Sequence, residues 1–285
     1  MSHFILPMML NLPTTYWAAE DDSQDGPDIP KLEKLAKAGD VDAQFELGAN
    51  YIVGLGVAKN GPKGMKLLMK AAEQGHVRAQ GNLGMCYMMG MGCRRNMGES
   101  LKWFHIAADN GNTEAMHSLS LCYLDGVGAE PDETEGLKWL QMAADGGHPD
   151  ALYDLGMLYL DGEIVEKDQK KAVALFKKAA DDLPDAALML GTCYQEGWGV
   201  RKNAAKAEEW LGKAAEGGGM GMLMRMMSCQ DEDENREMLR GMMGEEVGDD
   251  EIETLLGMIS TVAQGGNVES LLEMISAAEE EEDES

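Results

Sequence analysis

Small and apolar residues return along the chain at a nearly constant interval. Ala43, Leu47 and Tyr51 are spaced four residues apart, which places them on one stripe of an α-helix. The group recurs four more times, with its leucine at positions 83, 119, 155 and 190. The intervals of 36, 36, 36 and 35 residues predict five copies of one helical unit. We name the helix that carries this stripe helix A.

Turn residues follow each predicted helix A in the same register. Glycine adopts the left-handed backbone at a helix C-terminus without a Cβ penalty, and Asn or Asp can accept bonds from the free N–H groups of a new helix. A second helix, helix B, is therefore expected in each copy. The terminating glycines are Gly54, Gly90, Gly126, Gly162 and Gly197, and the expected N-caps are Asn60, Asn96, Asp132, Asp168 and Asn203.

Helix B has its own pattern, a large side chain one turn before a pair of alanines. A large residue that packs against small ones allows neighbouring units to stack closely. The large residues are Leu67, Trp103, Trp139, Leu175 and Trp210, and the alanine pairs begin at positions 71, 107, 143, 179 and 214.

These residues resemble the Sel-1-like repeat family, whose pattern is A-x-x-x-L-G-x-x-Y-x-x-G-x-G-V followed by K-A-x-x-W-x-x-K-A-A-x-x-G. The resemblance covers about residues 31–218. Ser120 replaces one helix A glycine, and Ile164 replaces one loop glycine. The resemblance implies an all-α fold, a right-handed α-α superhelical solenoid related to tetratricopeptide repeats, with about five repeats and C-terminal capping helices.

The expected organisation has four parts. Residues 1–30 form a partly disordered extension, whose apolar run is either docked on the first repeat or a cleaved signal. The solenoid spans 31–218, a degenerate repeat with capping helices spans 219–278, and an acidic disordered tail spans 279–285. The predicted repeats are about 43–78, 79–114, 115–150, 151–185 and 186–218.

Charge narrows the classes of partner. The net charge is −27, and residues 231–285 alone hold 19 acids and two bases. Such a chain repels phosphate groups, which argues against nucleic acid and anionic membrane and in favour of a basic protein.

No apolar stretch approaches the roughly 20 residues of a membrane helix. Five cysteines without paired spacing indicate reduced thiols and a cytoplasmic protein; a monomer is favoured.

The resemblance also suggests a binding face, because A helices line the concave side of tetratricopeptide-like solenoids. An apolar, methionine-containing surface flanked by acids would accept a basic amphipathic helix or peptide. The alternative, that these residues pack against helix B of the next unit, stays open. The candidate residues are Met85, Met88, Met89, Leu121, Leu124, Asp125, Met157, Leu160, Asp161 and Glu196.

We assign no catalytic, cofactor-binding or metal-ligating residue. Cys86, Cys122 and Cys193 each directly precede a repeat tyrosine, so they are expected as small buried residues. His76 and His148 fall in turns between repeats. His105 and His117 lie on successive helices, and we interpret them as a coincidental pair.

The sequence therefore favours a non-enzymatic protein-interaction scaffold or adaptor. A narrower version is an inhibitor, immunity or chaperone-like protein for a basic partner. An alternative of another class, implied by the resemblance, is a hydrolase of the cysteine-rich Sel-1-like β-lactamase type, although the paired cysteines of those relatives are absent. A calcium-responsive protein is a further alternative, because the acidic runs could collect divalent cations. These runs lack the residue spacing of an EF-hand loop, which favours diffuse, weak binding.

Overall fold

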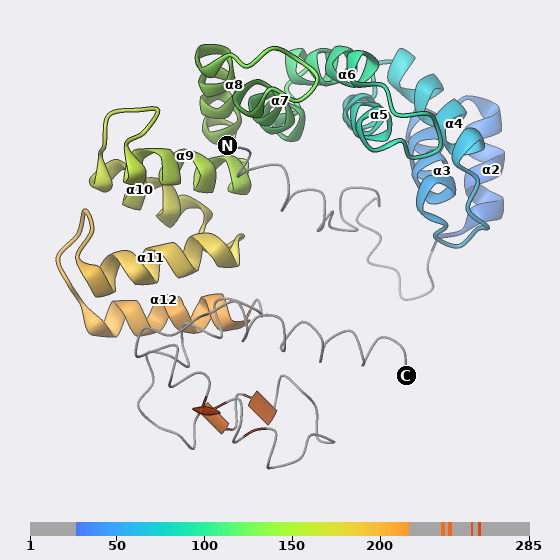
Figure 1. Ribbon diagram of the computed structural model, residues 1–285. Coiled ribbons are helices and arrows are strands. Elements are labelled where there is room, and N and C mark those ends of the chain that lie inside the picture. Colours follow the sequence, from blue (N-terminus) through green and yellow to red (C-terminus); the bar gives the residue numbers. More distant parts are fainter. Residues whose placement is uncertain (1–26, 217–234, 237–238, 241–251, 253–255, 258–285) are drawn as a thin grey trace. The chain divides into compact units, whose positions relative to one another are not determined.

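A computed structural model describes residues 27–216 and the short segments 235–236, 239–240, 252 and 256–257. In this part eleven α-helices and no strand are found, so the predicted all-α solenoid is confirmed (Figure 1). The chain divides into a first unit, residues 1–151, and a second, residues 152–285. The predicted extension up to residue 26, the tail and nearly all of the degenerate repeat and capping helices lie outside the described residues.

In the first unit, A and B helices alternate along the chain, and each A helix packs against the B helix that follows it (Figure 1). The A helices are α3 (Val41–Val53), α5 (Val77–Met89) and α7 (Thr113–Asp125), and the B helices are α4 (Gly61–Glu73), α6 (Met97–Asp109) and α8 (Glu133–Asp145).

The second unit begins in the first turn of α9. It continues the alternation with α9 (Pro149–Asp161) and α11 (Pro184–Glu196) as A helices and α10 (Gln169–Ala179) and α12 (Ala204–Glu216) as B helices.

An additional helix, α2 (Ile29–Ala38), precedes the first repeat and was not predicted. It packs against α3, where Ala36 joins Ala43, Leu47 and Tyr51 in one buried cluster. α2 therefore occupies the place that helix B of a preceding repeat would take, and it covers the apolar side of α3.

The predicted helix ends are confirmed. Gly54, Gly90, Gly126, Gly162 and Gly197 all have positive φ angles between 69° and 93°. The five predicted N-caps each accept a bond from a backbone N–H in the first turn of helix B, at 3.0–3.2 Å. The local chemistry read from the repeat thus fixes where each helix begins and ends.

The core pairs a small residue of helix A with a large residue of helix B. A Cβ on Gly84 would lie 2.4 Å from Cδ1 of Phe104, and one on Gly156 would lie 2.6 Å from Cε1 of Phe176. Both phenylalanines are fully buried. In the third repeat, Ser120 takes the glycine's place and the smaller Leu140 takes that of the phenylalanine. In the first and fifth repeats a glycine faces a leucine, Gly48 against Leu68 and Gly191 against Leu211. In these five repeats phenylalanine therefore occurs only opposite a glycine, whereas leucine occurs opposite glycine or serine.

Neighbouring repeats also touch through backbone. A Cβ on Gly92, in the loop after α5, would lie 2.6 Å from the carbonyl oxygen of Gly61, the first residue of α4. In the second unit, a Cβ on Gly199 would lie 2.2 Å from the carbonyl oxygen of Gln169. These loop glycines allow one repeat to approach the next.

Candidate partner-binding face

Four positions of each helix A, spaced by four, three and four residues, share one side of the helix. In α3 they are Asp42, Glu46, Ala49 and Val53. The opposite side of α3 holds Leu47 and Gly48, which pack into the core. We call these positions in all A helices the A stripe; it points away from helix B of the same repeat.

The structure places the sequence-predicted residues in two different rows. Seven lie on the A stripe, whereas Met88, Leu124 and Leu160 lie in the adjacent row. On the stripe, Met85 and Leu121 are buried, Met89, Asp125 and Met157 are half-buried, and Asp161 and Glu196 are exposed.

The adjacent row packs toward helix B of its own repeat. A Cβ on Gly136 of α8 would lie 2.7 Å from Cγ of Leu124, and Ile52 holds the equivalent position against Gly64. Met88 and Leu160 are buried in the same register, at 5% and 7% exposure. The three predicted residues of this row therefore pack in the core of their own repeats. Whether any of the ten residues contacts a partner stays a prediction.

Carboxylates dominate the charged positions of the stripe. In the first unit they are Asp42, Glu46, Glu114, Asp125 and Asp150, and Arg78 is the only basic residue among the described stripe positions there. Asp42 is well exposed, with 86% of its side chain accessible. In the second unit the stripe positions hold Asp154, Asp161, Asp185 and Glu196 and no Lys or Arg. Each unit thus has an acidic stripe.

Glu114 has an unusual protonation equilibrium. Burial raises its pKa to about 7, and the nearby Asp150 adds to this, while Arg78 and His117 act in the opposite direction. Near neutral pH the carboxyl group is therefore about half protonated. A cation of a partner placed beside it would favour the ionised form.

Two histidines that sequence reasoning placed in turns act as helix N-caps. The backbone N–H of Ala79 donates to Nδ1 of His76 at 3.1 Å, and that of Ala151 donates to Nδ1 of His148 at 3.3 Å. The His76 ring also stacks on Phe45, whose centroid is 4.4 Å away. The N-cap register, which holds Asn112 in the intervening repeat, was the available signal for this role.

The other histidine pair does not form. His105 contacts Tyr123, with 3.0 Å between Nε2 and the tyrosine oxygen. His117 instead lies beside His148, with ring centroids 4.9 Å apart. The structure therefore brings together the histidines of α7 and of the turn before α9.

We expect His148→Asn to reduce the acid sensitivity of the protein. Burial, helped by the nearby His117 and opposed by Asp150, lowers the pKa of His148 to about 4. Between pH 6.5 and 4 the unfolded chain binds a proton that the folded chain excludes, so stability falls as the pH falls. Asparagine preserves the cap, as Asn112 shows with its 2.6 Å bond to the Ala115 N–H.

Thermal unfolding at several pH values tests this. At pH 7.5 the variant should match the wild type, and by pH 4.5 it should be more stable by on the order of 2 kcal/mol. Parallel pH profiles for the two proteins would contradict the role of His148.

The cysteines have the surroundings of structural residues. Cys86, Cys122 and Cys193 are buried, as predicted. Burial raises the pKa of all three thiols, that of Cys122 to about 12 and that of Cys193 to about 11. Across residues 27–216 and the short described segments, no three His, Cys, Asp or Glu residues are grouped to hold a metal ion. No helix in the described part is sufficiently long and apolar to span a bilayer.

Comparison with known proteins accounts for this architecture. The sequence model of the Sel1 repeat matches residues 41–76, 77–112, 113–148, 149–182 and 184–219. The chain belongs to the Sel1 repeat family. Sel1 repeat proteins are generally protein–protein interaction scaffolds and are mostly non-enzymatic. The recognition of five such repeats from the sequence is thereby confirmed.

Two solved structures show the same fold. A Sel1 repeat protein from Oxalobacter formigenes is 35% identical, with a TM-score of 0.64 over 67% of this chain and 56% of its own. The c5321 protein, a protective antigen of uropathogenic Escherichia coli with this repeat fold, is 27% identical, with a TM-score of 0.68 over 90% of this chain and 56% of its own. The chain thus spans a little over half the length of either. No curated protein matches the sequence.

Proposed function

We propose that this Sel1 repeat protein is a scaffold or adaptor that binds a basic segment of a partner protein through its acidic A stripe, on the concave side of the solenoid. The observation that supports the proposal most is the recurrence of carboxylates at the two ends of the stripe. Asp42, Glu114, Asp150 and Asp185 occupy the first position, and Asp125, Asp161 and Glu196 occupy the last. Repeated carboxylates favour Lys and Arg in a ligand and repel acidic competitors.

Accessible apolar surface on the stripe is limited. Ala49, Met85 and Leu121 are buried, Met89, Met157 and Met189 are half-buried, and among the apolar residues at described stripe positions only Val53 is exposed. The proposed ligand is therefore a segment rich in Lys and Arg, with apolar side chains that reach the accessible methionines of the unit to which it binds. Flexible methionine side chains adapt to ligands of different shape.

Binding rather than catalysis fits the chemistry of the described residues. Glu114 has a raised pKa, but its neighbours Arg78, His117 and Asp150 do not form the pairing of a nucleophile with a base and an orienting group. The unpaired cysteines give no support to a hydrolase of the cysteine-rich type. Within the scaffold proposal, an inhibitor or immunity role would differ only in the partner, a basic toxin or secreted protein.

A matched pair of variants tests the proposal. The stripe variant carries Asp42→Asn, Glu46→Gln and Asp150→Asn. The control carries Glu73→Gln, Asp109→Asn and Asp145→Asn, which are exposed residues near the C-termini of the B helices. Both sets change the net charge equally, so a difference in partner binding between the two variants reports the position of the carboxylates and not their number.

Each immobilised protein is used to capture partners from the source cell, and retained proteins are quantified by mass spectrometry. A basic partner should be retained by the control and reduced roughly tenfold by the stripe variant, since exposed ion pairs contribute about 0.2–1 kcal/mol each. Equal retention by both variants would place the site elsewhere. No retained partner would count against the scaffold role and return attention to enzymatic activity.

A further inference from the structure

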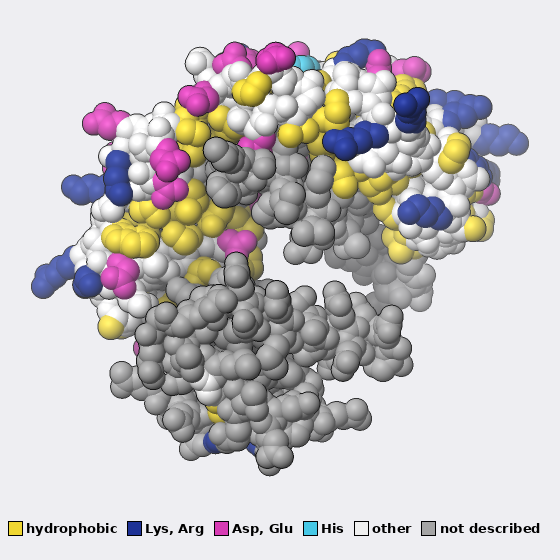
Figure 2. All heavy atoms as spheres, viewed as in Figure 1, with side chains coloured by type: hydrophobic (Ala, Val, Ile, Leu, Met, Phe, Trp, Pro, Cys, Tyr) yellow, Lys and Arg dark blue, Asp and Glu magenta, His cyan; other side chains and the backbone are white. Residues whose placement is uncertain are grey.

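The first unit contains a local excess of positive charge that the composition of the whole chain conceals. Residues 27–95 hold ten Lys and Arg and six Asp and Glu. Lys63, Lys66 and Lys70 of α4 are spaced by three and four residues and so share one side of that helix. Dark-blue side chains gather over this part of the chain (Figure 2).

α2 and α4 present their lysines together. Leu67 of α4 packs against the cluster that includes Ala36 of α2, and Nζ of Lys63 lies 3.3 Å from Oε1 of Glu33. Lys34 and Lys70 hold the same register, each two residues before a buried alanine, Ala36 or Ala72. They therefore project toward the same side of the two helices.

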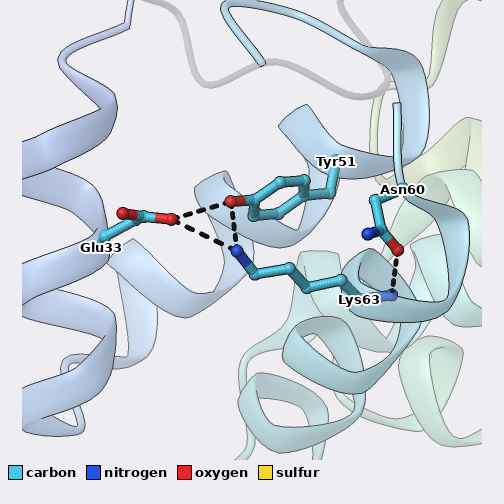
Figure 3. Close-up of polar contacts among 4 residues, drawn as sticks. All are labelled: Glu33, Tyr51, Asn60 and Lys63. Atoms are coloured by element: carbon cyan, nitrogen blue, oxygen red, sulfur yellow. Dashed lines mark hydrogen bonds and ion pairs between the residues drawn. The ribbon is translucent and has the colours of Figure 1, made fainter. Parts of the chain in front are cut away.

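Only one of these lysines has a carboxylate partner among the described residues. Lys63 bonds to Glu33 and to the hydroxyl of Tyr51, which also donates to Glu33 at 2.8 Å (Figure 3). Lys34, Lys37, Lys66 and Lys70 are exposed and form no ion pair with another described residue. We call these four the lysine face.

The sequence supplies a segment of complementary charge. Residues 279–284, which lie outside the described residues, read Glu-Glu-Glu-Glu-Asp-Glu, six consecutive acids. Runs of about five or more like charges often act as interaction segments. The acidic A stripe would repel this segment, whereas the lysine face attracts it.

We propose that the lysine face of one copy binds residues 279–284 of a second copy. This contact joins different surfaces of the two molecules. Reciprocal exchange of the segments closes a two-fold dimer, whereas one-way association leaves one lysine face and one acidic segment unused and grows into chains or larger rings. Either assembly departs from the monomer that the sequence favoured.

Two variants separate the contributing surfaces. The face variant carries Lys34→Glu, Lys37→Glu, Lys66→Glu and Lys70→Glu. The tail variant replaces residues 279–284 by the isosteric amides Gln and Asn. A control carries the same four charge reversals at exposed lysines of the second unit: Lys167, Lys170, Lys178 and Lys202. Circular dichroism verifies that each variant is folded.

Sedimentation equilibrium at an ionic strength of about 0.1 M, where charges more than about 10 Å apart are screened, gives the mass of each species. The wild type and the control should associate as concentration rises, and the association should be lost in about 1 M salt. The face and tail variants should each associate roughly tenfold more weakly or not at all. An equimolar mixture of the two should recover association, because one supplies the segment and the other the face.

Two outcomes would overturn the proposal. If the mixture fails to associate while a labelled peptide of residues 279–285 binds the tail variant more tightly than the wild type, the segment occupies the face of its own chain. If the peptide binds the face variant and the tail variant equally, the lysine face is not its site. Neither outcome depends on the acidic A stripe, so the proposed function is tested separately.

Discussion

Gly84→Ser is expected to destabilise the protein by about 1–3 kcal/mol. The added side chain would begin 2.4 Å from the Phe104 ring, which is fully buried in α6, so the ring or the backbone must shift within a packed core. Serine is a better helix former than glycine, and this gain of a few tenths of a kcal/mol offsets only part of the clash. Thermal and urea unfolding measure the effect.

The third repeat indicates how the loss can be recovered. There Ser120 and Leu140 replace the glycine and the phenylalanine, and the serine hydroxyl donates to the carbonyl of His117 at 2.7 Å. Phe104→Leu alone leaves a gap and should cost about 1 kcal/mol. Because the two changes together reproduce a native pair, the double variant should be more stable than the sum predicts, with a coupling of about 1 kcal/mol or more.

A matched control comes from α6, the helix that contains Phe104. Gly98→Ser lies in the exposed first turn of α6, where a Cβ would meet only the Asn96 side chain, at 3.5 Å. It should change stability by less than about 0.5 kcal/mol. Strict additivity of Gly84→Ser and Phe104→Leu would show that the size match within a repeat does not determine core packing.

Gly92→Ala is expected to destabilise the protein by about 3 kcal/mol or more. Its φ of +75° is unfavourable for a residue with a Cβ, at a cost of about 1–2 kcal/mol. The new methyl group would also lie 2.6 Å from the carbonyl oxygen and 2.8 Å from the carbonyl carbon of Gly61. Since backbone cannot change rotamer, the loop must move away from α4, and the contact between repeats is weakened.

Gly111→Ala separates these two costs. Gly111 also has a positive φ, +89°, but no atom lies within 4 Å of its Cβ position. It should therefore cost about 1–2 kcal/mol, the conformational part alone. Both variants are compared by thermal unfolding under the same conditions. Equal losses would show that the approach of Gly92 to Gly61 contributes nothing measurable to stacking.

Sequence reasoning was most successful where the decisive chemistry is local. The left-handed glycines and the Asn and Asp caps act within one or two turns of their own position, so their identity and spacing suffice to place the helix ends. Ile164 shows the limit of this reasoning, because the other four copies have a positive-φ glycine there and this copy does not. Nothing in the described structure explains that exception.

The candidate face was harder to predict, because side-chain exposure depends on neighbouring helices. Met88 and Leu124 are next to stripe positions in sequence, yet Leu124 packs against Gly136, and Met88 is buried in the same register. Periodicity along one helix identifies which residues share a side. It does not identify which of two adjacent rows another helix covers.

The sequence by itself determined the repeat, its length, its helix boundaries and its family, since each follows from local residue types recurring at one interval. The tertiary structure alone decided the packing of α2 on α3, the burial that raises the pKa of Glu114 to about 7, and the pairing of Lys63 with Glu33. These properties depend on residues brought together from different helices. Desolvation and charge pairing respond to distance in space, which the order of residues does not specify.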